Sequence, residues 1–508
     1  MSLGRHRVVT YRLLKKNRDL ILLVALYLIF RLVNLTLLPV FNDESIYLHW
    51  GWKELHEDGQ LYYSLMDGKQ PLLMWIFGYF ENIFSSALFA GRFVGVVFGL
   101  LTLFGIYRIG IKVFNKRISL IAGGLYIVVP LFSFFDRQAL MESAVGAIGV
   151  WLCYLFLELY EKQNLVLAFL IGVFFGLGLF MKSDVLIFLF PILFLSIYFS
   201  LTKMIHFTKK LFFSFVVFII TSQIVLYPLY RQWQFWINLS SYNRYVLTSE
   251  LKSIPYRLWI SHSVQGVNIL FWHLGIIPFI IGIIGVISIL FSRSWKQKYI
   301  ALWTTVSLFF IFLLGKNISP RYVVSFVPLF TLYVGFAFNA VFKKHRMFGI
   351  FFLLFLPLEL TLLQIFFPLE YFSVLDTFTK HSQKAEYVTN WTSGYGVSEA
   401  CTFIEKIVKN KPSYVSVRGD FGNPEDGIFT CFQKKELIKP VYFDAGMLRR
   451  DMQDITCITD LSPATIPDYF ISRDEQLGGL DDFLIEEKKF YKPERKSFIG
   501  VYRIKKDC

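Results

Sequence analysis

Apolar runs of about twenty residues alternate along most of the chain with short segments that contain lysine and arginine. A helix rises 1.5 Å per residue, so a run of this length matches the hydrocarbon thickness of a bilayer. The pattern predicts a polytopic α-helical membrane protein with about eleven transmembrane helices. The expected spans are 20–40, 90–112, 118–135, 142–160, 165–181, 185–201, 211–229, 267–291, 299–315, 322–341 and 347–368.

The basic residues predict which loops face the cytoplasm, because short cytoplasmic loops collect lysine and arginine. The segment 5–18 is basic, which favours a cytoplasmic amino terminus and an uncleaved first span. The other basic clusters lie near residues 108–117, 203–210, 293–298 and 343–346. The long loops at 41–89 and 230–266, and everything after Pro368, are then extracytoplasmic. The protein is expected in the plasma membrane.

One apolar segment, 71–89, does not fit this topology. It is long enough to span, yet a span there would move the basic cluster at 108–117 outside. It also carries Glu81 and Asn82 near its middle. We interpret it as a helix lying in the outer membrane interface.

The composition changes after residue 370, where charged residues become frequent and short apolar runs alternate with glycine, proline and aspartate. Residues 1–370 are therefore expected to form the membrane domain and 371–508 a small extracytoplasmic α/β domain. A helix is predicted at Val397–Val408, with strands at Tyr414–Val417, Leu437–Tyr442, Asp468–Ile471 and Phe498–Ile504.

Cysteine usage leaves the redox state of this domain open. Four of the five cysteines lie in it: Cys401, Cys431, Cys457 and Cys508. An exported domain permits disulfides, but spacing alone gives no pairing, and reduced thiols fit equally well.

The overall composition agrees with a membrane protein, since 55% of the 508 residues are hydrophobic and only 18% are charged. The net charge of +15 is spread over short loops rather than gathered in one patch. Positive-inside topology accounts for this distribution, so no nucleic-acid partner is expected.

Charged residues that carry candidate chemistry are predicted on the outer side. Acids at a membrane edge are costly to bury, so Asp43, Glu44 and Glu142 attract attention. The cations and one phenol expected at the same level are Lys69, Arg137, Lys182, Arg321 and Tyr322. Carboxylates beside cations suit a phosphate-bearing lipid. Helix termination, snorkelling and surface ion pairing remain alternatives for individual residues.

Five motifs in one order resemble a known family. They begin with Phe41–Tyr47 (FNDESIY), Gly68–Trp75 (GKQPLLMW) and Ala90–Thr102 (AGRFVGVVFGLLT), and continue with Asp136–Glu142 (DRQALME) and Ser319–Tyr322 (SPRY), followed by Pro328. This order resembles the protein O-mannosyltransferases and their relatives that transfer aminoarabinose to lipid A, all polytopic GT-C glycosyltransferases. The resemblance covers most of residues 20–330.

The resemblance implies an inverting transfer of a sugar from a polyprenyl-phosphate donor to a protein, glycan or lipid acceptor. It maps a base onto Asp43 with Glu44 beside it, and a phosphate ligand onto Lys69. It maps the acid of the second outer loop onto Glu142, which would orient the acceptor or hold a divalent metal ion. Many relatives have two prolines after the lysine, whereas Gln70 fills the first place here.

The sequence leaves several alternatives open. The sugar, the acceptor and any metal requirement are not determined by it. A transporter or flippase of polyprenyl-linked sugars is the alternative function, although such proteins usually contain internal repeats and mid-membrane charges. A catalytically silent scaffold is a third possibility.

Overall fold

The computed structural model of the chain describes residues 18–205, 208–240, 254–342, 346–379, 382–409, 411–443, 467–474, 476–477, 480 and 483–505. The contacts divide the chain into two compact units. Unit 1 comprises 1–35, 64–73 and 92–367, and unit 2 comprises 36–63, 74–91 and 368–508. Unit 2 thus combines the carboxyl-terminal region with most of the segment predicted as the first outer loop.

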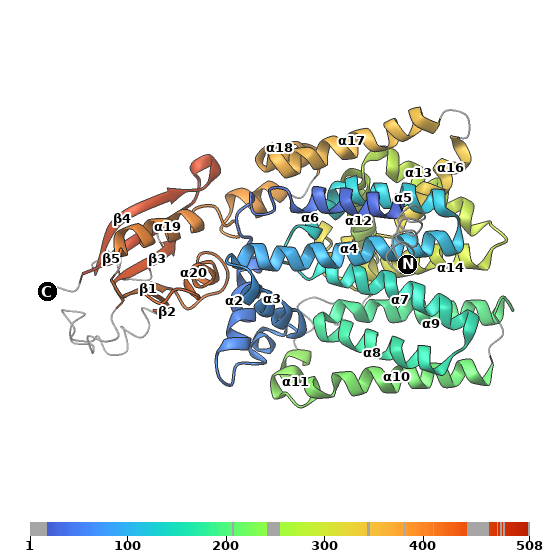
Figure 1. The fold of residues 1–508 in the computed structure, drawn as a ribbon, viewed down its shortest axis with the longest axis horizontal. Coiled ribbons are helices and arrows are strands. Elements are labelled where there is room, and N and C mark those ends of the chain that lie inside the picture. Colours follow the sequence, from blue (N-terminus) through green and yellow to red (C-terminus); the bar gives the residue numbers. More distant parts are fainter. Residues whose placement is uncertain are drawn as a thin grey trace, which may run out of the picture. The chain divides into compact units, whose positions relative to one another are not determined.

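Unit 1 is built from apolar helices (Figure 1). A first helix is described over 18–32. It is followed by α4 (Ala87–Val113), α5 (Lys116–Val128), α6 (Pro130–Asp136), α7 (Glu142–Lys162), α8 (Leu165–Met181), α9 (Leu189–Leu201), α10 (Lys209–Tyr230), α11 (Trp233–Ser240), α12 (Tyr256–Leu274), α13 (Ile276–Leu290), α14 (Trp295–Leu314), α15 (Pro320–Val324), α16 (Phe330–Val341) and α17 (Arg346–Phe366). Short turns of 3-10 helix lie at Tyr63–Asp67 and Ser183–Phe188.

Among the described residues, six helices are long and apolar enough to cross a membrane, and two bent helix pairs raise that number to at most eight. The helical membrane class is therefore confirmed, while the count of eleven stays a prediction. Three expected spans differ in detail. The first helix ends at residue 32 rather than 40, and the span expected at 118–135 bends by 65° between α5 and α6. The span expected at 267–291 is broken by a 119° bend at Gly275, whose φ of +90° ends α12.

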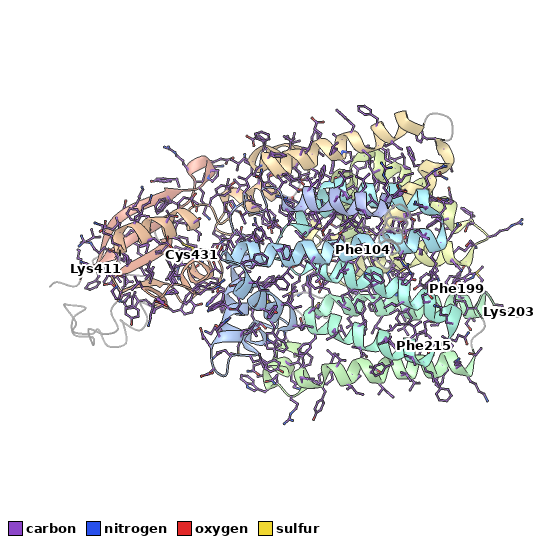
Figure 2. All side chains as sticks on the ribbon, in the orientation of Figure 1. Phe104, Phe199, Lys203, Phe215, Lys411 and Cys431 are labelled. Atoms are coloured by element: carbon purple, nitrogen blue, oxygen red, sulfur yellow. A yellow bond between two sulfur atoms is a disulfide. The ribbon has the colours of Figure 1, made fainter. Side chains whose placement is uncertain are left out.

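Small residues let some of these helices approach closely. Gly172 and Gly176 lie one turn apart on α8, and a Cβ on Gly172 would come within 2.6 Å of the Phe218 carbonyl of α10. This spacing is typical of tight helix pairs in membranes. Phenylalanines fill the neighbouring space, with Phe156 of α7 packing against Phe215 and Phe218 of α10. Phe215 is labelled in Figure 2.

Unit 2 contains the α/β domain predicted from the sequence. Its helices are α2 (Asn42–His56), α3 (Leu72–Ile83), α18 (Pro368–Phe378), α19 (Val397–Val408) and α20 (Glu425–Phe432), with shorter turns at Ala385–Thr389 and Pro493–Arg495. Its strands are β1 (Ser413–Val417), β2 (Ile438–Tyr442), β3 (Tyr469–Arg473), β4 (Leu484–Tyr491) and β5 (Phe498–Ile504). The four predicted strands and the predicted helix are present, and β4 and α20 are additional.

The five strands form one mixed sheet in the order β2-β1-β3-β5-β4. β1 pairs in parallel with β2 and β3, while β5 runs antiparallel to β3 and β4. Alternate residues of the central strands, such as Val415 and Val417, face α19 and α20 in one hydrophobic core. Cys401 of α19 and Cys431 of α20 form a disulfide (Cys431 is labelled in Figure 2), which resolves two of the four cysteines. Cys457 and Cys508 lie outside the described residues.

Candidate active site

Three helix ends of unit 1 meet at Glu142. Glu142 is the first residue of α7, Lys182 directly follows α8, and Arg321 lies in the short helix α15. The Oε1 atom of Glu142 accepts hydrogen bonds from Arg321 Nε at 2.7 Å and from Lys182 Nζ at 3.0 Å. A helix amino terminus favours a negative charge, so both the helix and the two cations stabilise the buried carboxylate.

The two cations extend toward a less buried environment than the carboxylate does. The Glu142 side chain is 0% exposed, whereas the side chains of Lys182 and Arg321 are each 15% exposed. Lys182 also pairs with Asp184 at 2.8 Å, and the Tyr322 ring lies 5.8 Å from its ammonium group. Burial acts to lower the pKa of Lys182, but the carboxylates of Asp184 and Glu142 outweigh it, so the pKa is raised. Lys182 therefore stays charged.

The second carboxylate oxygen of Glu142 has no such contacts. Oε2 is buried and has no hydrogen-bond partner among the described residues. A buried polar atom without a partner typically costs about 1–3 kcal/mol.

The turn that carries Lys69 is attached to the same region. Gly68 adopts a φ of +75°, which a glycine tolerates. Lys69 and Gln70 follow this turn in the sequence. The side-chain oxygen of Gln70 accepts a hydrogen bond from the Ser183 main-chain nitrogen at 3.3 Å. Ser183 lies between Lys182 and Asp184, so Gln70 joins the Lys69 turn to the segment that bears Lys182. The Lys69 ammonium is paired with Asp67. Gln70, which departs from the family pattern, thus has a structural role that the sequence did not reveal.

Arg137 is placed differently from the other candidate cations. Its Nη1 donates to the carbonyl oxygens of residues 30, 31 and 33, and its Nη2 donates to that of Asn34. These carbonyls lie at the end of the first helix, where intrahelical donors are missing. Arg137 therefore caps that helix, which explains why the helix ends before the position expected from hydropathy.

The remaining candidates, Asp43 and Glu44, begin helix α2 in unit 2. Glu44 is fully buried, and its Oε2 accepts a hydrogen bond from the Phe41 main-chain nitrogen at 2.9 Å, which caps the helix. Asp43 is partly exposed and lies 3.5 Å from the hydroxyl of Tyr47 and 3.4 Å from the amide nitrogen of Asn42. The adjacent acids thus differ in burial, and Asp43 is the one with access to solvent.

The acids in the described part of unit 1 do not form a metal site of the usual kind. No group of three or more histidine, cysteine, aspartate or glutamate side chains within the described part of the chain could hold a metal ion. Glu142 instead faces two cations, which compensate its charge and repel a divalent ion. The residues present do not fit a metal at Glu142.

Comparisons with known proteins agree with the motif pattern. Residues 68–227 match the model of a family described as dolichyl-phosphate-mannose-protein mannosyltransferase. This stretch begins at Gly68 and includes Lys69, Arg137, Glu142 and Lys182. No curated protein matches the sequence as a whole or in part.

Solved structures of two enzyme types share the fold. ArnT from Cupriavidus metallidurans, bound to undecaprenyl phosphate, superposes with a TM-score of 0.58 at 11% identity, over 96% of this chain and 98% of that one. The Archaeoglobus fulgidus oligosaccharyltransferase, in complex with Zn and sulfate, gives a TM-score of 0.54 at 15% identity over 84% of this chain. The chain spans only 62% of the length of that oligosaccharyltransferase.

A further structure of the archaeal enzyme, AglB with an inhibitory peptide and a dolichol-phosphate, gives a TM-score of 0.51 at 14% identity. ArnT and AglB are both GT-C glycosyltransferases. The predicted resemblance is thereby confirmed: this chain has the fold of the GT-C membrane glycosyltransferases.

Proposed function

We propose that this protein is an inverting membrane glycosyltransferase that moves a sugar from a polyprenyl-phosphate donor to an acceptor hydroxyl group. The observation that carries the proposal is the buried Glu142, held with Lys182 and Arg321 where three helix ends of unit 1 meet. Two partly exposed cations that are fixed by a buried acid provide preorganised positive charge. The GT-C fold, shared with an ArnT bound to undecaprenyl phosphate, supports a lipid-phosphate ligand.

The cations of unit 1 are assigned to the donor phosphate. Arg321 and Lys182 are positively charged and each is 15% exposed. Lys69 is tied to the segment that bears Lys182 through Gln70 and Ser183. As the sugar C1–oxygen bond breaks, the bonding electrons move to the phosphate oxygen. The cations stabilise the charge that develops there, so no general acid is needed for the departing lipid phosphate.

Asp43 is assigned as the base. The acceptor oxygen attacks C1 from the face opposite the phosphate, and the hydroxyl proton passes to the Asp43 carboxylate. The partial exposure of Asp43 supports this role, whereas the buried Glu44 acts as the cap that holds the start of α2. Tyr322 and Glu142 Oε2 are assigned to substrate hydroxyl groups.

The outer face of the plasma membrane is the proposed place of the reaction, with the amino terminus in the cytoplasm and the carboxyl-terminal domain outside. The Cys401–Cys431 disulfide supports this side, because disulfides persist in oxidising compartments. The acceptor is a protein, a glycan or a lipid. A related archaeal structure contains a tethered acceptor peptide, which makes a protein acceptor the first to test.

The proposal is tested by removing the chain from its host and comparing the masses of surface glycoproteins, glycans and lipids. Restoring the wild-type chain should return a hexose- or pentose-sized mass, and Asp43→Asn should not. Asp58→Asn, which changes an exposed acid in the same predicted outer loop, is the control and should restore the mass fully. Full restoration by Asp43→Asn at equal protein level would show that Asp43 is not the base.

The transporter alternative predicts a different result. Purified protein in vesicles would then move a lipid-linked sugar across the bilayer without any acceptor. Sugar transfer in detergent, where no compartments exist, would exclude transport as the sole activity.

A further inference from the structure

The start of helix α2, which carries Asp43, is held by the loop between β1 and α20. Asn423 in this loop is fully buried. Its main-chain nitrogen donates to Asn42 Oδ1 at 3.0 Å, and its Nδ2 donates to the carbonyl oxygens of Val40 at 3.0 Å and Thr392 at 3.2 Å. The Asn42 nitrogen donates to the same Thr392 oxygen at 2.9 Å. One asparagine thus fixes the chain on the amino-terminal side of Asp43.

A second contact holds α2 two turns further along. His49 Nδ1 lies 2.5 Å from Asp426 Oδ1, and both side chains are buried. The His49 ring also stacks on Phe429 of α20 at 4.2 Å. The other oxygen of Asp426 accepts a hydrogen bond from the Gly422 nitrogen at 2.6 Å, so one carboxylate ties the loop, α20 and α2 together.

The local fold leaves little freedom at this contact. Gly422 adopts a φ of +98°, and a Cβ there would overlap the Asn42 side chain. Cys431 of α20 is disulfide-bonded to α19, which anchors the helix that bears Asp426. The contact is therefore made by a rigid part of the α/β domain.

The two contacts together determine how α2 is rotated. Residues 42 and 49 are seven apart and lie on the same helix face, about 10 Å apart along the axis. A helix held at two such points can neither roll nor slide. Asp43 follows Asn42 by one residue, so its direction is set by that rotation.

We infer that Asn423 and Asp426 are positioning residues for Asp43, so that the carboxyl-terminal domain takes part in catalysis by orienting the base. This inference rests on the proposed role of Asp43 as the base. A base must lie within hydrogen-bond reach of the proton it takes, and a displacement of about 1 Å can cost about 100-fold in rate. The residues act through α2 and need no contact with substrate.

The test compares three single substitutions in the full-length detergent-purified protein. Asn423→Ala removes the side-chain hydrogen bonds to the carbonyl oxygens of Val40, just before α2, and Thr392, and leaves the main-chain bond to Asn42 in place. Asp426→Asn leaves a single acceptor oxygen where His49 of α2 and the Gly422 nitrogen now have two. Asp420→Asn in the same loop removes an ion pair with Arg473 and is the matched control. Sugar transfer from the native lipid-linked donor is measured per folded protein. We expect kcat to fall about 100-fold for the first two, with the donor KM changed less than about threefold, and no change for Asp420→Asn.

Hydrogen exchange of the peptide containing residues 40–50 provides a readout that does not need activity. Exchange should become faster in Asn423→Ala and Asp426→Asn and remain unchanged in Asp420→Asn. Faster exchange together with an unchanged kcat would overturn the positioning role, as would unchanged exchange. If the wild-type protein transfers no sugar, the proposed function fails, while the exchange result still shows whether the contact holds α2.

Discussion

Asp136 and Glu142 are buried acids six residues apart in unit 1, and their surroundings differ. Asp136 Oδ2 accepts from Arg31 at 3.1 Å and from the Tyr27 hydroxyl at 3.3 Å, while Oδ1 accepts from Tyr126 and Ser143, each at 3.1 Å. Both of its oxygens are satisfied, and its cation Arg31 is 0% exposed. Glu142 has one bonded oxygen and one without a partner, and its cations are partly exposed.

Under the proposed function, this difference separates an acid that holds the fold from an acid assigned to the substrate site. The Asp136 network has no remaining acceptor and no exposed cation, so a substrate has nothing to contact there. The Glu142 cluster offers a buried acceptor and two fixed cations. The sequence analysis named Glu142 as a candidate and Asp136 only as part of the same motif, and it did not predict that Asp136 is buried among four hydrogen-bond donors.

The largest expected effect is on stability at Asp136. Asp136→Ala leaves Arg31 buried without a counter-charge, which typically costs about 3–5 kcal/mol. Thermal unfolding of the detergent-purified variant should show a large loss of stability, or folded protein should be absent. Asp136→Asn keeps the shape and should recover part of the loss. A stable Asp136→Ala protein would contradict the structural role.

Glu142→Gln should act on catalysis instead. The neutral amide no longer fixes Lys182 and Arg321, so kcat should fall by about 100-fold, and donor KM should rise as well because both cations are assigned to the donor phosphate. Steady-state kinetics of sugar transfer measure this effect. Glu158→Gln is the matched control, because Glu158 lies on the same helix and pairs with Lys112 and Lys162. If Glu142→Gln and Glu158→Gln lowered kcat equally, the acid at the start of α7 would have no special role in catalysis.

Glu425 in unit 2 extends the comparison to a third buried acid, whose charge is stabilised little by neighbouring groups. Its Oε2 has no hydrogen-bond partner among the described residues, and burial raises its pKa to about 7. The folded protein then keeps a proton that the unfolded chain releases near pH 4.5. The contribution of Glu425 to the free energy of unfolding should fall as pH rises from about 4.5 to about 7, by at most about 3 kcal/mol, and stay constant above.

Thermal unfolding at pH 5 and pH 8 measures this effect. Glu425→Gln should reduce the pH dependence. Burial also raises the pKa of Glu81 to about 8, so Glu81→Gln should remove a further part of the pH dependence of stability. A pH dependence that is unchanged in both variants would contradict the assignment.

The smallest effect expected is that of Arg321→Lys. Lysine keeps the charge but lacks the planar fork that binds Glu142 and a phosphate oxygen at the same time. Donor KM should rise about tenfold, corresponding to one charge-assisted hydrogen bond. Arg108→Lys, at a residue that bonds Tyr154, serves as the control. An unchanged donor KM would show that Arg321 binds Glu142 but does not bind the donor phosphate.

Much of the architecture was predictable because it follows from local patterns. Long apolar runs gave the helices of unit 1, and the short apolar runs between glycine, proline and aspartate after residue 370 gave α19 and four of the five strands. The helix α20 was missed because it is short and begins after a glycine- and proline-containing turn. The bends at Gly275 and between α5 and α6 were missed because hydropathy does not register a change of direction.

The residue types of the candidate site, acids and cations beside apolar runs, were determined by the sequence alone, together with the order of motifs that marks the GT-C fold. Only the tertiary structure decided which of them act together. It assigned Arg137 to a helix end and Glu44 to a helix cap, and it brought to Glu142 both Lys182, 40 residues away, and Arg321, 179 residues away. Hydrogen bonds of that sequence separation depend on how helices pack, and one sequence without its fold does not contain that information.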